Sequence, residues 1–183
     1  MSPYRIGIVV GSLRRESFNR RFADAVVRLA PAGFTFAHLR IDDLPLYNQD
    51  ADGNPAETVK RLKAEIAATQ GILFVTPEYN RSIPGVLKNA LDQASRPYGQ
   101  SAWAGKPAGV MGVSVGAIGT SMAQQHLRNV LAYLDMPTLG QPEVYVQAKD
   151  GLFDGAGNLA PDTAKFMQGW MDRYVAWVKK HAG

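Results

Sequence analysis

The chain has 183 residues, of which 46% are hydrophobic, 20% charged and 9% aromatic, and its formal net charge is +4. This length and composition predict a single globular domain over residues 1–183 and exclude a disordered or collagen-like chain. The lack of cysteine excludes disulfides, thiolate nucleophiles and cysteine-bound metals. The three histidines, His38, His126 and His181, are too scattered in the sequence to predict a metal site.

Neither a membrane nor a nucleic acid is predicted as a partner. No apolar run reaches the roughly 18 residues that a membrane-spanning helix needs. The first residues do not resemble a signal peptide, so we expect a cytoplasmic protein. Most of the basic surplus lies between residues 11 and 28, where five arginines (Arg14, Arg15, Arg20, Arg21 and Arg28) accompany only Glu16 and Asp24. Such a local cluster favours a small anionic ligand over a nucleic acid, which would require a longer basic stripe.

Short apolar runs alternate with amphipathic segments along the whole chain. The apolar runs predict strands at residues 4–10, 34–41, 71–76, 108–114 and 143–146. Apolar side chains at helical spacing predict four helices, marked by Phe18, Phe22, Val26 and Leu29; by Val59, Leu62 and Ile66; by Leu87, Leu91 and Ala94; and by Leu127, Val130, Leu131 and Leu134. A long final helix is predicted over residues 161–180, and Pro84 suits the first turn of the third helix.

Strands that alternate with helices predict βαβ units, and therefore a parallel sheet covered by helices on both faces. The strands are continuous apolar runs, as expected for strands that are buried on both sides. The predicted fold class is therefore a three-layer α/β domain. In such sheets, ligands bind beyond the carboxyl ends of the strands, which are followed here by loops at residues 11–19, 44–50, 76–84 and 114–120.

The loop at residues 11–19 follows a predicted strand and opens a predicted helix, so its backbone N–H groups and the helix dipole can bind an anion. Ser12, Ser17 and Asn19 add short polar side chains, and Arg14 can donate a charge-assisted hydrogen bond to a phosphate. The loop matches neither the Walker A pattern nor the G-x-G-x-x-G fingerprint of dinucleotide sites. We therefore predict a phosphate site. The alternative is that Ser17 only caps the helix and the arginines are solvated.

Two further loops have unusual compositions. In the loop at residues 76–85, Tyr79 and Asn80 lie between two prolines, and such a stiff loop can present backbone N–H and C=O groups to the edge of a flat heterocycle. Glu78 could be a general acid or base, but spacing places no second carboxylate or histidine beside it. The glycine-rich loop at residues 114–120 either allows a ligand to approach closely or forms a tight strand-to-helix turn.

Together, these stretches resemble the NADPH-dependent FMN reductase family of flavodoxin-like proteins, in particular its quinone and chromate reductase branch. The resemblance is carried by Gly11-Ser12-Leu13-Arg14 with Ser17 and Asn19, by Leu44-Pro45-Leu46-Tyr47-Asn48, and by Pro77-Glu78-Tyr79-Asn80 with Ser82, Pro84-Gly85 and Leu87-Lys88-Asn89-Ala90-Leu91-Asp92. Order and spacing hold from about residue 4 to residue 146. The resemblance implies a flavodoxin-like sandwich whose five-stranded parallel sheet has the order 2-1-3-4-5.

The resemblance also implies where FMN binds. Its phosphate would be bound by Ser12, Arg14, Ser17 and Asn19, and its isoalloxazine would contact Pro77, Glu78, Tyr79 and Asn80 on one side and Ser114 and Gly116 on the other. Arg81 departs from the family, in which this position is often small or aromatic. With Tyr47, it would lie at the rim of the substrate site. Arg81 and Arg15 are the candidates for contacting the 2′-phosphate of NADPH.

The implied activity is that of an FMN-dependent NAD(P)H oxidoreductase, with NADPH or NADH as co-substrate and no catalytic side chain. Hydride would pass through flavin N5 by a ping-pong mechanism to a quinone or a similar small acceptor, such as chromate, an azo or nitro compound, or free flavin. The alternatives are a flavodoxin-type electron carrier and a nonenzymatic FMN-binding module. The basic net charge argues against the carrier, because such carriers usually dock through an acidic surface.

A homodimer or homotetramer is also expected. The final helix carries Phe166, Trp170, Tyr174 and Trp177, and with the neighbouring Met and Val residues they form an apolar arc wider than packing on one sheet requires. The alternative is that this helix covers a large sheet edge. Members of the family are usually dimers or tetramers, and the resemblance places Arg128 and Glu143 at a tetramer interface.

Overall fold

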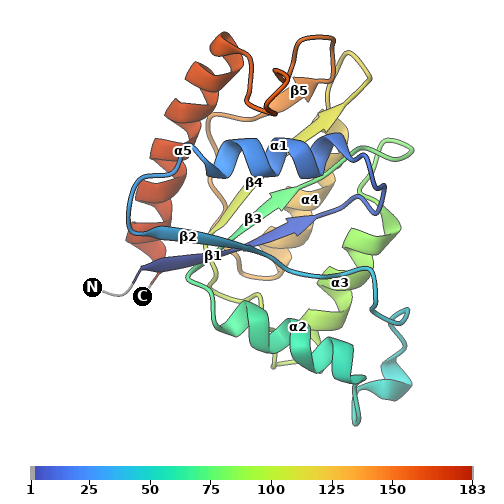
Figure 1. Cartoon of the computed structure of the whole chain (residues 1–183). Coiled ribbons are helices and arrows are strands. Elements are labelled where there is room, and N and C mark those ends of the chain that lie inside the picture. The colour runs from blue at the N-terminus through green and yellow to red at the C-terminus, as the bar shows by residue number, and fades with distance from the viewer. Residues whose placement is uncertain (1–2, 183) are drawn as a thin grey trace.

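The computed structural model describes residues 3–182 and contains one five-stranded sheet (Figure 1). Its strands are β1 (Tyr4–Val10), β2 (Phe34–His38), β3 (Gly71–Val75), β4 (Ala108–Ser114) and β5 (Tyr145–Gln147). All neighbouring strands pair in parallel, in the order β2-β1-β3-β4-β5. The predicted sheet order and fold class are therefore confirmed.

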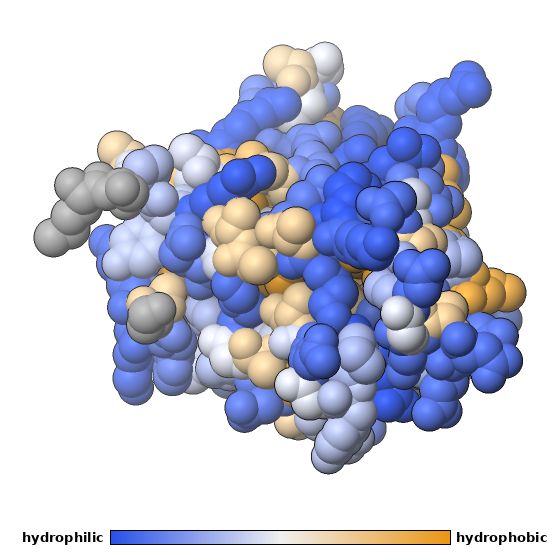
Figure 2. Space-filling model, turned by 90° about the horizontal axis from the view of Figure 1, so that it is seen from below, coloured by the Kyte–Doolittle hydropathy of each residue, from blue (hydrophilic) through white to orange (hydrophobic). Residues whose placement is uncertain are grey.

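Helices cover both faces of the sheet (Figure 1). The helices α1 (Phe18–Val27) and α5 (Pro161–His181) pack on one face, and α2 (Glu57–Ala67), α3 (Gly85–Ser95) and α4 (Ser121–Tyr133) pack on the other. A short 3-10 helix at Gln49–Ala51, which the sequence did not predict, lies in the loop before α2. Among the described residues, every helix is too short or too polar to cross a membrane. The surface seen from below in Figure 2 is mostly hydrophilic, with apolar side chains in small separate groups.

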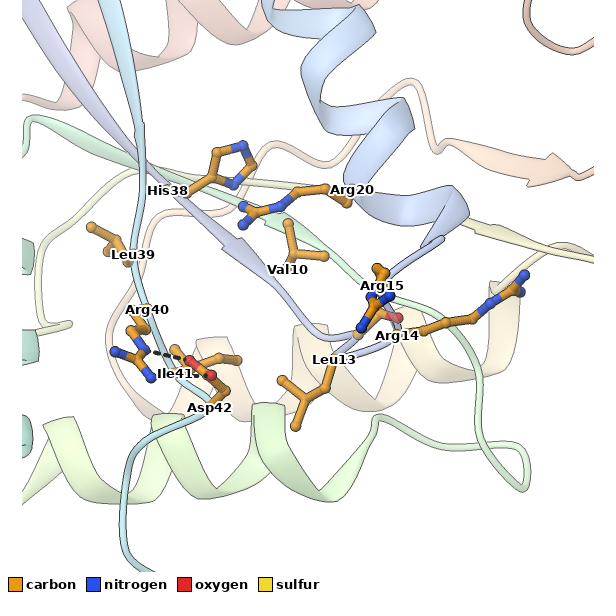
Figure 3. Close-up of a pocket in the computed structure, with 11 residues that line it drawn as sticks. Val10, Leu13, Arg14, Arg15, Arg20, His38, Leu39, Arg40, Ile41 and Asp42 are labelled. Atoms are coloured by element: carbon orange, nitrogen blue, oxygen red, sulfur yellow. Dashed lines mark hydrogen bonds and ion pairs between the residues drawn. The ribbon is translucent and has the colours of Figure 1, made fainter. Parts of the chain in front are cut away.

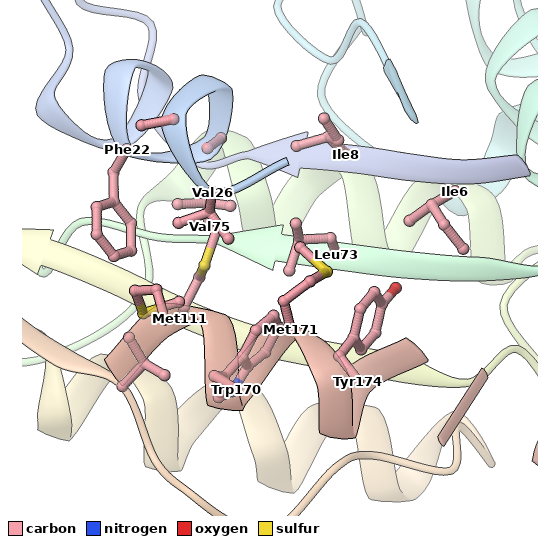
Figure 4. Close-up of a cluster of buried hydrophobic side chains, with 14 of the residues drawn as sticks. Ile6, Ile8, Phe22, Val26, Leu73, Val75, Met111, Trp170, Met171 and Tyr174 are labelled. Carbon is pink, nitrogen blue, oxygen red and sulfur yellow. The ribbon is translucent and has the colours of Figure 1, made fainter. Parts of the chain in front are cut away.

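The face of the sheet under α1 and α5 holds the larger hydrophobic cluster (Figure 4). Phe22 of α1 and Trp170 and Tyr174 of α5 are at most 1% exposed. On the opposite face, Trp103 is fully buried and its indole N–H donates to the carbonyl of Leu91 (3.1 Å). Burying this much apolar surface on both sides fixes the register of the central strands, and so fixes where their carboxyl ends meet.

The broad apolar arc on α5 is used largely within the chain. Met167, Trp170, Met171, Tyr174, Val175 and Val178 are all buried. Trp177 is partly buried, and its indole N–H donates to the carbonyl of Pro137 (2.8 Å), whereas Phe166 is 45% exposed. Packing against the sheet thus accounts for most of the apolar side chains of α5. This favours the alternative interpretation, in which the helix covers the sheet.

Several predicted boundaries differ from the structure, and the ends of β3, β5 and α5 do so by one residue each. The edge strand β2 ends at His38 rather than at residue 41. β5 begins at Tyr145 rather than at residue 143, and the Glu143 carboxylate before it accepts from the Gln125 side chain of α4 (2.9 Å). Pro84 has an extended conformation (ψ 147°) and is the N-cap of α3, one residue before the first helical turn.

Candidate functional site

The loop between β1 and α1 forms an anion cradle. Gly11 N–H donates to the carbonyl of Val75 (2.9 Å), which fixes the start of the loop beside β3. From Ser12 to Asn19, no backbone N–H donates to another group in the described part of the chain. The loop leads into the N-terminus of α1, where the helix dipole adds positive potential. The geometry and donor chemistry fit a phosphate group.

Two side chains expected to bind the phosphate have partners within the protein. Ser17 is the N-cap of α1, and its hydroxyl accepts from Arg20 N–H (3.2 Å). The Asn19 side chain donates to the carbonyl of Val113 and accepts from Val113 N–H, at 2.9 Å each. Both residues are only 3% exposed. Asn19 therefore fixes α1 to β4, and the group that it presents to the cradle is its backbone N–H.

Ser12 and Arg14 remain available to a ligand. Ser12 is half-buried in the loop, and Arg14 is exposed. The Arg14 guanidinium lies 5.5 Å from the centroid of the Phe18 ring at the start of α1. This cation–π contact holds the positive charge beside the cradle without neutralising it.

The loop between β3 and α3 ends in a tight, outward-pointing turn. Tyr79 and Ser82 exchange two backbone hydrogen bonds of 3.0 Å, and the two residues between them, Asn80 (φ 52°) and Arg81 (φ 65°), have left-handed conformations. This combination is typical of a two-residue hairpin turn. The N–H groups of Glu78, Asn80 and Arg81 have no acceptor among the described residues, and the Tyr79 side chain is 52% exposed. The turn therefore presents backbone donors beside an exposed ring, as a flat heterocycle requires.

Glu78 joins this turn to α4. Its carboxylate accepts from the N–H groups of Met122 (3.0 Å) and Ala123 (3.1 Å) in the first turn of α4. The Glu78 side chain is only 8% exposed, and its other oxygen lies 3.5 Å from the Arg81 guanidinium. The N-cap residue of α4, Thr120, makes no side-chain capping bond of its own. Glu78 therefore supplies the missing cap, which accounts for its carboxylate without a role in proton transfer.

The third loop follows β4 and lies beside the second. The Ser114 hydroxyl accepts from Gly116 N–H (3.2 Å), and Val115 at its tip is 71% exposed. Gly119 has φ +61°, and a Cβ there would lie 2.8 Å from the backbone of Tyr145. At Gly112, a Cβ would lie 2.2 Å from the Thr76 carbonyl oxygen, so this glycine lets the two loops converge. The close approach supports a tight turn and leaves the loop tip open to a ligand.

Sequence reasoning missed a second link between the turn and α4. His126 Nδ1 lies 2.9 Å from the Ser82 hydroxyl, at hydrogen-bond distance. The two residues are 44 positions apart, so their spacing offers no local signal. Together with Glu78, this pair fixes the turn at its start and at its end.

The two residues predicted at the rim of the substrate site lie in different places. Tyr47 N–H donates to the Asn89 side chain (2.8 Å), and the Tyr47 ring lies beside α3, 5.6 Å from the Arg96 guanidinium. Burial is the main cause that raises the pKa of Tyr47. Arg81 is 71% exposed at the rim of the turn.

Arg128 and Glu143 contact each other within the chain. Their closest atoms are 4.0 Å apart, and the Arg128 guanidinium donates to the carbonyl of Leu139 (2.8 Å).

The three loops thus lie together at the carboxyl end of the sheet, where the N–H donors of the first loop adjoin the turn that carries the exposed Tyr79. This arrangement fits an α/β protein that binds a nucleotide with a flat ring. Residues 4–151 match the NADPH-dependent FMN reductase family, and the chain belongs to this family. It is an oxidoreductase that uses FMN and NAD(P)H, so the enzyme interpretation is confirmed over the carrier and the nonenzymatic module.

Relatives cover nearly the whole chain. It is 54% identical to a 2-hydroxy-1,4-benzoquinone reductase of a Burkholderia species, over 96% of both chains. It is 50% identical to a quinone reductase of Pseudomonas putida, over 96% of this chain and 95% of the relative. The structure of the flavoenzyme NAD(P)H:acceptor oxidoreductase FerB from Paracoccus denitrificans is 42% identical and superposes with a TM-score of 0.93, covering 97% of this chain and 98% of FerB.

Proposed function

We propose that the protein reduces quinones with NAD(P)H by a ping-pong mechanism in which donor and acceptor use the same face of bound FMN in turn. The run of unpaired backbone N–H groups from Ser12 to Asn19 carries the proposal, because such a run at the switch point of the sheet supports a phosphate site. The names of the relatives support a quinone as the acceptor.

In this proposal, the first loop holds the FMN phosphate. Backbone N–H groups and the Ser12 hydroxyl donate to its oxygens, and Arg14 adds a charge-assisted hydrogen bond. Ser17 and Asn19 act by fixing the geometry of the cradle, since their side chains already hold α1 in place. A preorganised cradle binds the phosphate without ordering a flexible loop.

The second and third loops would hold the isoalloxazine. Tyr79 supplies exposed aromatic surface, and Pro77, which is buried, would act by fixing the start of the turn. The N–H groups of Glu78, Asn80 and Arg81 can donate to polar atoms on the ring edge. Ser114 and Gly116 would border the other side. When bound, FMN supplies the two-electron chemistry between the nicotinamide and the acceptor. The protein contributes fixed donors and the Arg81 charge, which stabilise negative charge that develops on the ring.

Steady-state kinetics of the purified protein test this proposal. NADPH or NADH is varied against 2-hydroxy-1,4-benzoquinone at several fixed concentrations. Parallel double-reciprocal lines are expected, because the two substrates never occupy the face together. Intersecting lines would refute the ping-pong sequence, and failure to oxidise NAD(P)H with any quinone would refute the function. Chromate, azo and nitro compounds and free flavin belong in the same series as competing acceptors.

We further propose a homodimer, formed through the groove between α3 and α4. This groove encloses about 910 Å³, and Tyr47, Arg96, Tyr98 and Tyr133 are among the residues that line it. Tyr98 and Tyr133 are 84% and 81% exposed. Exposed aromatic side chains around a groove are typical of protein interfaces. A second contact, through Arg128 and Glu143, would join two dimers into a tetramer. The use of NAD(P)H as co-substrate favours a location in the cytoplasm.

Light scattering coupled to size exclusion tests the interface. Tyr98→Asp with Tyr133→Asp should yield monomers at a concentration where the unchanged protein is a dimer. Phe166→Asp places the same charge on α5 and should leave the dimer intact. Dissociation by Phe166→Asp alone would move the interface to α5.

A further inference from the structure

A second cavity adjoins the first loop on the side away from the proposed ring site (Figure 3). It encloses about 600 Å³ between the carboxyl ends of β1 and β2. Its lining comprises Val10, Ser12, Leu13, Arg14, Arg15, Arg20, His38, Leu39, Arg40, Ile41 and Asp42. None of these residues belongs to the second or third loop, and neither Ser17 nor Asn19 is among them. The cavity therefore lies apart from the second and third loops, and it shares only Ser12 and Arg14 with the side chains proposed to bind the FMN phosphate.

The cavity carries an excess of positive charge. Four arginines line it with one carboxylate, that of Asp42. Arg40 pairs with Asp42 at 2.8 Å and lies 3.5 Å from the Asp43 carboxylate, whereas Arg15 and Arg20 have no ion-pair partner within residues 3–182. Like charges gathered around one concave space repel each other unless an anion lies between them. The cavity thus has the electrostatic character of an anion site.

His38 lines the cavity and is affected by the positive charge of Arg20. Its Nε2 lies 2.7 Å from the Asp24 carboxylate, and in Figure 3 the Arg20 side chain points toward its ring. Burial is the main cause that lowers the pKa of His38. The hydrogen bond to Asp24 raises this pKa, and the charge of Arg20 lowers it further. An anion near Arg20 would offset that charge, so the His38 ring reports on occupancy of the cavity.

The shape of the cavity indicates more than an inorganic ion. Leu13, which is 57% exposed, lies on one side, and Leu39 and Ile41, which are 5% and 4% exposed, form the wall that follows β2. An apolar wall beside guanidinium groups suits a ligand with a flat apolar part and a charged group. The volume lies within the range of about 300–1,000 Å³ typical of small-molecule sites. A nucleoside phosphomonoester meets both requirements.

We propose that this cavity binds the phosphomonoester of a nucleotide, with Arg20 and Arg40 as its side-chain donors. The inference rests on the proposed function in one respect: NADPH, the co-substrate of that function, carries a phosphomonoester at its 2′ position that could bind here. A free nucleotide is the other source of the same chemistry. Of the two arginines that were candidates for the 2′-phosphate, Arg15 lines this cavity and Arg81 does not.

Binding is tested on the FMN-loaded protein by NMR of the His38 ring, assigned with His38→Gln. The probes are 2′,5′-ADP, 5′-AMP and inorganic phosphate. We expect 2′,5′-ADP to shift the His38 resonance saturably. Its dissociation constant should rise by about tenfold or more in Arg20→Gln/Arg40→Gln, since each lost contact is a hydrogen bond to a charged group. The matched control, Lys165→Gln/Arg173→Gln, removes two positive charges from α5 and should bind 2′,5′-ADP normally.

Kinetics then identify the source of the phosphate. If NADPH is the ligand, the KM for NADPH rises by about tenfold or more in Arg20→Gln/Arg40→Gln, while the KM and kcat for NADH stay unchanged. If 5′-AMP binds as well as 2′,5′-ADP and the NADPH to NADH ratio is unaffected, the site is supported with a free nucleotide as its ligand. No His38 shift with any probe, or equal 2′,5′-ADP affinity in both double variants, overturns the proposal. A flavin-free or inactive preparation would instead count against the proposed function, because the visible absorbance of the flavin and NADH oxidation are measured on the same sample.

Discussion

Replacing Glu78 by glutamine separates its structural role from a role in proton transfer. The substitution keeps the shape and one carbonyl acceptor for the N–H groups of Met122 and Ala123, but removes the negative charge. A hydrogen bond to a charged group contributes about 1.5–3 kcal/mol, and a neutral one about 0.5–1.5 kcal/mol. Each of the two bonds should therefore weaken by about 1 kcal/mol. The lost interaction with the α4 dipole adds about 0.3–1 kcal/mol.

The free energy of unfolding should thus fall by about 2–3 kcal/mol in Glu78→Gln. Little discount for solvent applies, because the side chain is only 8% exposed. Urea denaturation at a fixed excess of FMN measures the loss, and the FMN affinity of each variant corrects for stabilisation by bound ligand. Glu65→Gln is the control, since Glu65 pairs with Arg61 on the surface of α2 and should lose only about 0.3–0.5 kcal/mol.

The kinetic readout distinguishes the two roles of Glu78. A general acid or base contributes about 10²–10⁴-fold to the rate, whereas a helix cap affects kcat only through the position of the turn. We expect kcat to change by much less than 10²-fold. An unchanged unfolding free energy would refute the capping argument. A hundredfold loss of kcat with unchanged stability would assign proton transfer to Glu78.

Three further substitutions test other parts of the structure. Arg14→Ala should weaken FMN binding by about 1.5–3 kcal/mol, the scale of one charged hydrogen bond, as measured by quenching of flavin fluorescence; unchanged affinity would contradict the phosphate assignment. Gly112→Ala should lower the free energy of unfolding by about 1–3 kcal/mol, because its methyl would lie 2.2 Å from the Thr76 carbonyl oxygen. An unchanged denaturation midpoint in Gly112→Ala would show that β4 can shift away from the Thr76 carbonyl. Burial lowers the pKa of His38 from 6.5, so the folded protein binds this proton more weakly than the unfolded chain does. Stability should therefore fall as the pH drops below 6.5, with a shallower slope in His38→Gln; equal slopes would assign the pH dependence to other groups.

Most of the fold could be predicted because its determinants are local. The central strands β3 and β4 are buried on both sides, so their apolar runs stand out in the sequence. The strands at the two edges were less accurately bounded. β2 has only half-buried and exposed residues, and β5 has only three residues, so their ends depend on contacts with distant loops.

The site could be predicted at the level of loops but not of side-chain partners. The side-chain bonds of Asn19 to Val113 join residues 94 positions apart, and those of Glu78 to α4 span 44 and 45 positions. Such pairs depend on which loops the sheet order brings together. Little in the sequence indicated this role of Glu78, because Thr120 before α4 is a preferred N-cap residue and only the structure shows that its side chain makes no capping bond.

The contacts divide the site into a rigid frame and a variable rim. Side chains in the three loops mostly bond to the protein itself: Ser17 and Asn19 hold α1, and Glu78 and Ser82 hold the second loop on α4. The groups left for a ligand are chiefly backbone N–H groups, which substitution does not remove. Exposed side chains gather at the loop tips, at Tyr79, Arg81 and Val115. Arg81 is the charged residue at this rim, so exchanging it for a small residue should alter the ranking of anionic and neutral quinones by kcat/KM. Equal changes for both classes of quinone would show that the Arg81 charge does not contact the acceptor.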